Sequence, residues 1–283
     1  GILAAFVLSS LLLDIPPGLW ISAAILTLVS FYGDRSGLSP KFRLPIQFSA
    51  ASVFLLTGLL CNSPSVFYSP TFPLFSPGTL LWVIFLAVFM VGTANIYNFM
   101  DGINGIAGIT GTIGFGFLAY FARTSGAASS FVTLAICMSI ACIGFLPFNM
   151  PRAKVFMGDV GSILLGFAFA GMVVLISKSF LDFFCLAAFL FPFYADELTT
   201  MYVRLRDREN LTCPHRKHLY QLLANELEVP HWKVSMGYGF VQLFVGTSIL
   251  LIKNIGCIAV ISILAIYFCG FAGLTYVIRK KLG

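Results

Sequence analysis

The stretch NMPRAKVFMGDVGS, residues 149–162, places one carboxylate, Asp159, beside two glycines and between two long apolar runs. A carboxylate at membrane depth costs about 2.5–3.5 kcal/mol to insert, so such a residue is expected to have a function. A helix cap, in which Asp159 accepts N–H groups at the start of the next helix, is the alternative interpretation. Two further carboxylates, Asp34 and Asp101, lie at matching positions beside other apolar runs, which favours a shared site.

The composition around this stretch is typical of a membrane protein. Hydrophobic residues form 59% of the 283 residues, charged residues form 10%, and the mean hydropathy is +0.95. We therefore predict an all-α, polytopic integral membrane protein with a single transmembrane domain over residues 1–283. Ten apolar runs, most near the ~20 residues that a spanning helix needs, are the candidate spans: 1–13, 19–32, 45–61, 79–98, 105–122, 129–148, 160–177, 181–195, 234–252 and 256–278.

The positions of Lys and Arg predict the orientation of these spans. Fourteen of the 17 cations follow the second, sixth and eighth spans or lie at the C-terminus. Because cytoplasmic loops carry an excess of Lys and Arg, both termini of this chain are predicted to be cytoplasmic. The net charge of +6 is then explained by attraction to the cytoplasmic leaflet, and it requires no nucleic-acid partner.

A polar turn, NFMDGING at residues 98–105, follows the fourth predicted span. Its glycines allow a backbone to approach a ligand closely, so the turn is a candidate binding loop. A calcium loop is a weaker alternative, because the glutamate expected at the twelfth position of that motif is absent.

The longest predicted cytoplasmic segment, residues 196–233, contains the basic sequence HRKH at 215–218. Apolar residues at helical spacing follow, which predicts an amphipathic helix in the headgroup plane with a basic opposite face. Two alternatives remain. The helix could bind only anionic lipid, or Cys213, His215 and His218 could form a zinc site, although their spacing fits no standard pattern.

Three motifs together resemble the polyprenyl-phosphate N-acetylhexosamine-1-phosphate transferase family (glycosyltransferase family 4), bacterial relatives of the phospho-MurNAc-pentapeptide translocase. NxxDGxNG at 98–105, NxPxxxVFMGDxGS at 149–162 and HRxH at 215–218 occur in the family's order. The resemblance implies eleven spans, of which the first would be absent here, and a cytoplasmic active site in the bacterial inner membrane. HRxHxYQ is most similar to O-antigen-initiating members that transfer N-acetylfucosamine or N-acetylquinovosamine phosphate, because the translocase carries histidines in place of Tyr220 and Gln221.

The activity implied by the resemblance is transfer of HexNAc-1-phosphate from a UDP-sugar to undecaprenyl phosphate, which gives undecaprenyl-diphosphate-sugar and UMP. Mg²⁺, or Mn²⁺ in its place, is the implied cofactor. The implied partners are UDP-N-acetylhexosamine, undecaprenyl phosphate and membrane lipid, with no nucleic acid; a homodimer is a further expectation.

The resemblance also assigns roles to individual residues. It makes Asp159 the magnesium ligand and a catalytic residue. The other implied catalytic residues are Asp34, Asp101 and His218, and the implied substrate-binding residues are Asn98, Asn104, Asn149, Asp196, His215 and Arg216. Asp34 matches the second member of a paired Asp-Asp, and Gly33 stands where the family has the first.

The proposed chemistry agrees with the residue types. Phosphoryl transfer needs positioning and charge neutralisation more than covalent chemistry, and Mg²⁺ held by one or two carboxylates and substrate phosphates supplies both. Because Gly33 cannot act as a nucleophile, we predict direct attack by the lipid phosphate, with Asp34 orienting the acceptor or removing its last proton. One rival function is that of the phospho-MurNAc-pentapeptide translocase. A secondary transporter is the second, but no internal repeat is found. The third is a lipid-binding scaffold, which would not explain the FMGD element.

Overall fold

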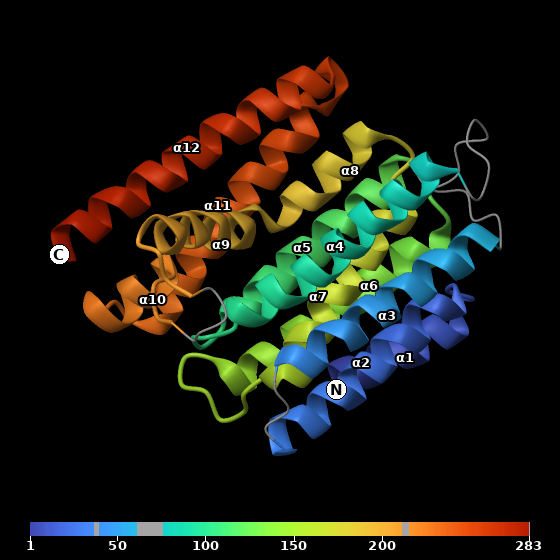
Figure 1. Cartoon of the computed structure of the whole chain (residues 1–283), viewed down its shortest axis with the longest axis horizontal. Helices are drawn as coiled ribbons and strands as arrows, with labels where there is room; N and C mark the ends of the chain where they lie inside the picture. Colours follow the sequence, from blue (N-terminus) through green and yellow to red (C-terminus); the bar gives the residue numbers. More distant parts are fainter. Residues whose placement is uncertain (37–39, 61–75, 211–214, 283) are drawn as a thin grey trace.

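The computed structural model describes residues 1–36, 40–60, 76–210 and 215–282, and every regular element in these ranges is a helix (Figure 1). The all-α prediction is therefore confirmed. The elements are α1 (Ile2–Leu12), α2 (Pro17–Ser36), α3 (Pro40–Leu60), α4 (Pro77–Phe99), α5 (Ile106–Thr124), α6 (Ser129–Asn149), α7 (Gly158–Ile176), α8 (Phe180–Ala187), η1 (Ala188–Leu190), α9 (Phe191–Arg206), α10 (Leu219–Gln221), η2 (Leu222–Glu226), α11 (His231–Ile252), η3 (Lys253–Ile255) and α12 (Cys257–Leu282).

Seven of the described helices are long and apolar enough to cross a membrane, namely α3, α4, α5, α6, α7, α11 and α12. Seven of the ten predicted spans are thus long apolar helices in the described part of the chain, and the other three do not meet this description. Helix α1 has only 11 residues, α2 is less apolar, and the eighth predicted span is divided among α8, η1 and α9. The chain is thus a polytopic, all-α membrane protein.

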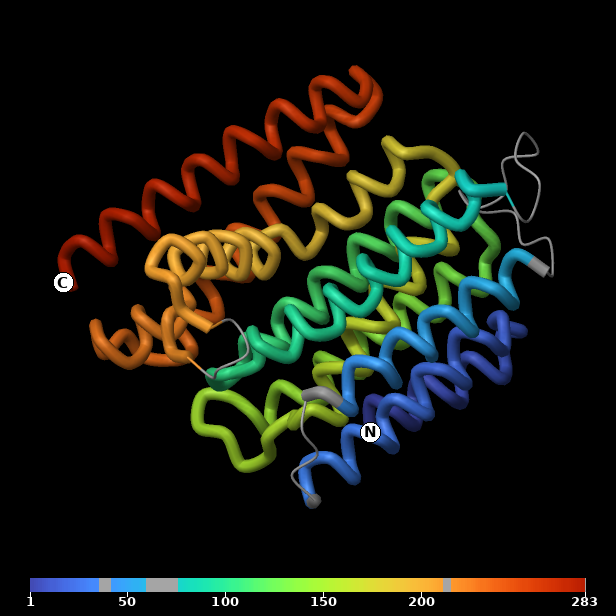
Figure 2. Tube along the Cα trace, viewed as in Figure 1, coloured from blue at the N-terminus to red at the C-terminus, as the bar shows by residue number. Residues whose placement is uncertain are grey.

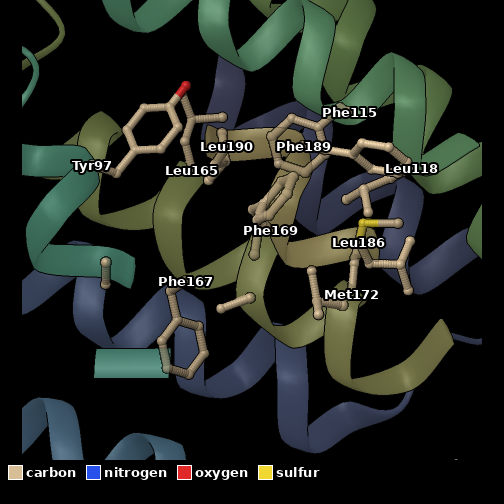
Figure 3. Packing of buried hydrophobic residues seen from close by; sticks show 14 of the residues in the cluster. Tyr97, Phe115, Leu118, Leu165, Phe167, Phe169, Met172, Leu186, Phe189 and Leu190 are labelled. Carbon is tan, nitrogen blue, oxygen red and sulfur yellow. The ribbon is translucent and has the colours of Figure 1, made fainter. Parts of the chain in front are cut away.

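Helix α7 is the buried centre of the bundle. All of its residues from Ser162 to Ile176 are buried, and it packs against α2, α4 and α5. Figure 3 shows Phe167 and Phe169 of this helix in the core, with Phe115 and Phe189 from other elements beside Phe169. A helix that is apolar on every side is expected in the interior. The helices that surround α7 also fix the position of its first turn, which contains Asp159.

Gly166 allows α4 and α7 to approach each other closely. A Cβ atom at this position would lie 2.7 Å from Cα of Ala94 and 2.8 Å from the carbonyl oxygen of Thr93. Small residues permit such contacts in membranes, where helix association depends on packing. This contact sets the end of α4, with Asn98, against the start of α7, with Asp159.

The helix break between α8 and α9 was not predicted from the sequence. Pro192 lies in the first turn of α9, and its missing N–H prevents a continuous helix. The carbonyl of Phe189 in the break accepts a hydrogen bond from Nε2 of Gln242 at 2.7 Å, which also donates to the carbonyl of Thr110 at 3.0 Å. These bonds satisfy backbone groups that would be costly if unpaired in lipid. Helix α9 then continues past the predicted end at residue 195.

The connections that carry the predicted motifs lie at one end of the bundle. In Figures 1 and 2, the α4–α5 turn, the α6–α7 connection and α10 share this end, whereas α12 and α1–α3 lie at opposite edges. Two hydrogen bonds agree with this arrangement: Nδ2 of Asn104 donates to the carbonyl of Pro151 at 3.2 Å, and Oγ of Ser235 donates to the carbonyl of Asn104 at 2.8 Å.

Candidate active site

Asp159, in the first turn of α7, contacts side chains from two other helices. Nη1 of Arg43, near the start of α3, forms an ion pair with Asp159, and Nη2 of the same residue lies 3.6 Å from Oδ1 of Asp34 in α2. Nδ2 of Asn98 donates to Oδ1 of Asp159 at 2.8 Å and to Oγ of Ser162 at 2.9 Å. The structure therefore brings Asp34, Asn98 and Asp159 together, and it adds Arg43, which the sequence identified only as a loop cation.

The helix-cap interpretation of Asp159 is not supported by this geometry. The N-cap residue of α7 is Met157, and no side chain caps the helix. Asp159 lies two positions further on, and its carboxylate is paired with Asn98 and Arg43 instead.

The residues around Asp159 fit a divalent cation. Mg²⁺ is usually held by one or two carboxylates, with water and substrate phosphate completing its coordination. The side chains of Asp34 and Asp159 are 38% and 27% exposed, and the guanidinium of Arg43 already lies between them as a positive charge. Within the described ranges, no group of three or more His, Cys, Asp or Glu could hold a metal ion. The protein would thus supply only part of the coordination shell.

Asn149 joins the binding turn to the α6–α7 connection. Gly105, at the end of the turn, has a φ of +87°, and its N–H donates to Oδ1 of Asn149 at 2.5 Å. Nδ2 of Asn149 donates to the carbonyl of Val155 at 2.9 Å, and the side chain is buried. Asn149, predicted to bind substrate, therefore connects two loops here.

Asp101 and Asn104 lie in the same turn and are both partly buried. Burial, with a smaller contribution from the charge of Asp159, raises the pKa of Asp101 to about 8, so this carboxyl is mostly protonated at pH 7. The N–H of Asn104 donates to Nδ1 of His231 at 3.4 Å. His231 is a neighbour of the turn that no sequence motif indicated.

Asp196 holds the start of α10. Its carboxylate is 0% exposed and accepts hydrogen bonds from the N–H of Leu219 at 2.7 Å, the N–H of Tyr220 at 3.3 Å and the hydroxyl of Tyr238 at 2.6 Å. The first N–H groups of a helix have no partners within the helix, and an acidic side chain satisfies them well. Asp196 was predicted to bind substrate, but its carboxylate already accepts hydrogen bonds from donors within the protein.

The residues of HRxH have very different exposures. His218 is 2% exposed, with Nδ1 3.7 Å from Oδ1 of Asp196 and Nε2 3.6 Å from Oε2 of Glu197. Burial, followed by the charges of His218 and Arg204, lowers the pKa of His215 to about 4, so its imidazole is neutral at pH 7. Arg216 is exposed and available to an anion.

The predicted amphipathic helix forms only in part. Helical residues are limited to α10 and η2, residues 219–226, so the basic residues 215–217 precede the helix and do not form its opposite face. The N–H of His218 donates to Oε1 of Gln221 at 3.3 Å, and Asp196 accepts from the N–H groups of Leu219 and Tyr220, so the helix begins at Leu219. The zinc alternative includes Cys213, which lies outside the described residues.

Tyr220 connects α10 to the binding turn. Its hydroxyl donates to the carbonyl of Phe99 at 2.8 Å. A Cβ atom on Gly102 would lie 2.2 Å from that hydroxyl oxygen, so a side chain at 102 would displace Tyr220. The HRxH segment and the turn at 98–105 are thus parts of one site.

The comparison with known proteins agrees with this architecture. The model of Glycosyl transferase family 4 matches residues 17–177, which include Asp34, Asn98, Asp101, Asn149 and Asp159. The phospho-N-acetylmuramoyl-pentapeptide-transferase of Staphylococcus saprophyticus subsp. saprophyticus is 30% identical over 225 residues, which cover 76% of this chain and 68% of that protein. The protein of the same name from Staphylococcus aureus (strain JH9) is 27% identical over 219 residues, covering 75% and 68%. The chain therefore belongs to glycosyl transferase family 4.

Proposed function

We propose that this chain transfers HexNAc-1-phosphate from a UDP-sugar to undecaprenyl phosphate, giving undecaprenyl-diphosphate-sugar and UMP at the cytoplasmic face of a bacterial inner membrane. Family membership supports the coarser statement, a membrane-bound sugar-phosphate transferase that acts on a polyprenyl phosphate. The observation that carries the proposal is the convergence of Asp34, Asn98 and Asp159 around one positive charge at the end of the bundle.

In the proposed mechanism, Asp159 would hold Mg²⁺, whose positive charge would neutralise the charge that develops on the diphosphate. Asp34 would orient the acceptor phosphate or remove its last proton. Asn98 orients the Asp159 carboxylate by donating to Oδ1, which leaves Oδ2 directed toward Arg43. The exposed Arg216 would bind the donor diphosphate, for which a guanidinium is well suited. Asp196 would act by positioning the HRxH segment.

Two classes of sugar donor are candidates for this chain. We propose an N-acetylfucosamine- or N-acetylquinovosamine-type donor used for O-antigen initiation, because Tyr220 and Gln221 replace the histidines of the translocase. The names of the two relatives favour a donor that carries a MurNAc-pentapeptide instead. The experiment below separates them.

Purified protein would be incubated with undecaprenyl phosphate, Mg²⁺ and a panel of radiolabelled UDP-HexNAc sugars, with UDP-MurNAc-pentapeptide in parallel. We expect lipid-soluble label and free UMP from a HexNAc donor. Label transferred only from UDP-MurNAc-pentapeptide would identify the translocase activity instead. No transfer from any donor, with solute uptake into proteoliposomes, would favour a transporter.

Direct attack predicts no reaction with donor alone. The lipid phosphate is already an anion near neutral pH, since the second pKa of a phosphomonoester is about 6, and it needs positioning more than a strong base. We therefore expect no release of UMP from enzyme, Mg²⁺ and UDP-sugar until undecaprenyl phosphate is added. A burst of UMP equal to the amount of enzyme, without acceptor, would contradict this mechanism and indicate a covalent intermediate.

Arg216→Ala is expected to raise the KM for the UDP-sugar about tenfold, the value of one charge-assisted hydrogen bond. The KM for undecaprenyl phosphate should stay near wild type, because the other cations of the segment remain. Lys233→Ala, which removes a cation packed over Trp232 in α11, is the matched control and should leave KM unchanged. An unchanged KM for the UDP-sugar in Arg216→Ala, with a raised KM for undecaprenyl phosphate, would support the lipid-anchor alternative. His218→Ala is expected to lower the rate as well, but it is a less specific test because His218 is buried and caps α10.

A further inference from the structure

Arg43 lies at the anionic centre of the proposed site. One of its terminal nitrogens pairs with Oδ2 of Asp159, and the other is 3.6 Å from Asp34. Its Nε is buried and has no hydrogen-bond partner in the described part of the chain. The guanidinium is therefore held by the two carboxylates and not by a complete set of protein acceptors.

Gly33 provides the space that Arg43 occupies. A Cβ atom at position 33 would lie 2.8 Å from Nη2 of Arg43 and 3.1 Å from its Nε. Contacts this short are not tolerated, so any side chain at 33 would move the guanidinium. Gly33 is itself buried, and the guanidinium packs directly against its backbone.

A divalent cation and this guanidinium would compete for the same carboxylate, that of Asp159. Two positive charges a few ångströms apart repel each other strongly, and the repulsion is greatest where water is partly excluded. Oδ1 of Asp159 accepts from Asn98, and Oδ2 is paired with Arg43, so a metal bound to this carboxylate would lie next to the guanidinium.

We propose that Arg43 is a built-in competitor of the divalent cation: it neutralises Asp34 and Asp159 in the metal-free protein and must leave Asp159 before the metal binds. This inference rests on the proposed function, because it requires a metal ion at Asp159. It makes Arg43 a residue that sets the metal affinity of the resting enzyme.

The test measures Mn²⁺ binding to the purified full chain in detergent, without substrates, from the electron paramagnetic resonance signal of free Mn²⁺. Arg43→Gln is expected to lower the Kd about tenfold, because one charge-assisted ion pair no longer has to break. Arg35→Gln is the matched control: it removes the same charge from the last turn of α2, where Arg35 packs over Phe31 at 4.6 Å. Its Kd should stay near that of the wild type.

A second variant tests the competition without changing any charge. Gly33→Ala introduces only a methyl group, which displaces the guanidinium sterically, so it should also lower the Kd for Mn²⁺. Gly58→Ala in α3, where a Cβ atom meets nothing within 4 Å, is its control and should bind as the wild type does. Arg43→Gln removes the charge and Gly33→Ala displaces it, so the two variants test the competition independently. If size-exclusion chromatography shows that one variant is misfolded, the other still serves as the test.

The outcomes separate this proposal from the proposed function. Wild-type Mn²⁺ binding that is lost in Asp159→Asn, but not tightened by Arg43→Gln or Gly33→Ala, would overturn the competition and leave the metal site intact. Absence of Mn²⁺ binding in the wild type and in every variant would overturn both the competition and the metal site. Tightening in the two variants, with neither control affected, supports the competition.

Discussion

Asp159→Asn is expected to reduce sugar-phosphate transfer by about 10³-fold, or about 4 kcal/mol of activation free energy. The fold should persist, because the side chain is 27% exposed and water can bind a donor that loses its acceptor. An amide has one acceptor oxygen, so it can accept from Asn98 or from Arg43 but not from both. It is neutral, however, and it cannot supply the charge that a divalent cation requires. Initial rates at saturating donor measure the effect on transfer, and thermal unfolding measures the effect on the fold. We expect a nearly unchanged Tm without nucleotide, together with a smaller stabilisation by UDP plus Mg²⁺.

The matched control for this variant is Asp182→Asn. Asp182 is also an acidic residue in the first turn of a helix, α8. Its carboxylate accepts from the backbone N–H of Lys178 at 3.0 Å, and its own N–H donates to Oγ of Ser179 at 3.1 Å. Its activity should stay within about twofold of the wild type, as for most surface substitutions. If Asp159→Asn kept wild-type activity, Asp159 would be removed from the metal site.

Asp196→Asn is expected to lower transfer about 10²-fold by loosening the HRxH segment. The carboxylate accepts from Leu219, Tyr220 and Tyr238, and hydrogen bonds to a charged group each contribute about 1.5–3 kcal/mol. An amide directs its NH₂ group at one of these donors, and that donor is left unpaired in a buried site. Hydrogen–deuterium exchange should therefore increase over residues 215–226 and stay unchanged in α4 and α7.

Tyr238→Phe is the graded control for Asp196→Asn. It removes one donor but leaves the carboxylate and the two N–H groups of α10 in place, so a smaller loss of activity is expected. Loss of activity in Asp196→Asn without any change in exchange would contradict the positioning role. Direct contact with substrate, as predicted from the sequence, would then be the better explanation.

Local features of the sequence predicted much of the fold. Continuous apolar runs require helices in a membrane, because each helix satisfies its own backbone groups. For this reason all ten apolar runs contain helical residues in the structure. The bounds of the helices were less predictable. The run at 181–195 is divided among α8, η1 and α9, because Pro192 interrupts the helix and Gln242 satisfies a carbonyl at the break. Helix α9 then continues past residue 195.

The positions of Asp34, Asp101 and Asp159 at the ends of apolar runs predicted a shared site, and the resemblance added Asn98. The structure brings Asp34, Asn98 and Asp159 together. Arg43 was not predicted to belong to this site. It is separated from Asp159 by 116 positions, and nothing in the local sequence distinguishes it from the other loop cations.

The sequence by itself determined the all-α membrane architecture and predicted Asp34, Asp101 and Asp159 as candidate site carboxylates, because apolar length and the cost of a charge near lipid are properties of a short segment. Only the tertiary structure decided which of the predicted residues face an accessible site and which already bond to other groups of the protein. Asp196 and Asn149 are buried among backbone donors and acceptors, whereas Asp159 meets Arg43 in partly exposed surroundings. Burial and pairing depend on groups from distant segments, and the packing of α4 against α7 brings those groups together.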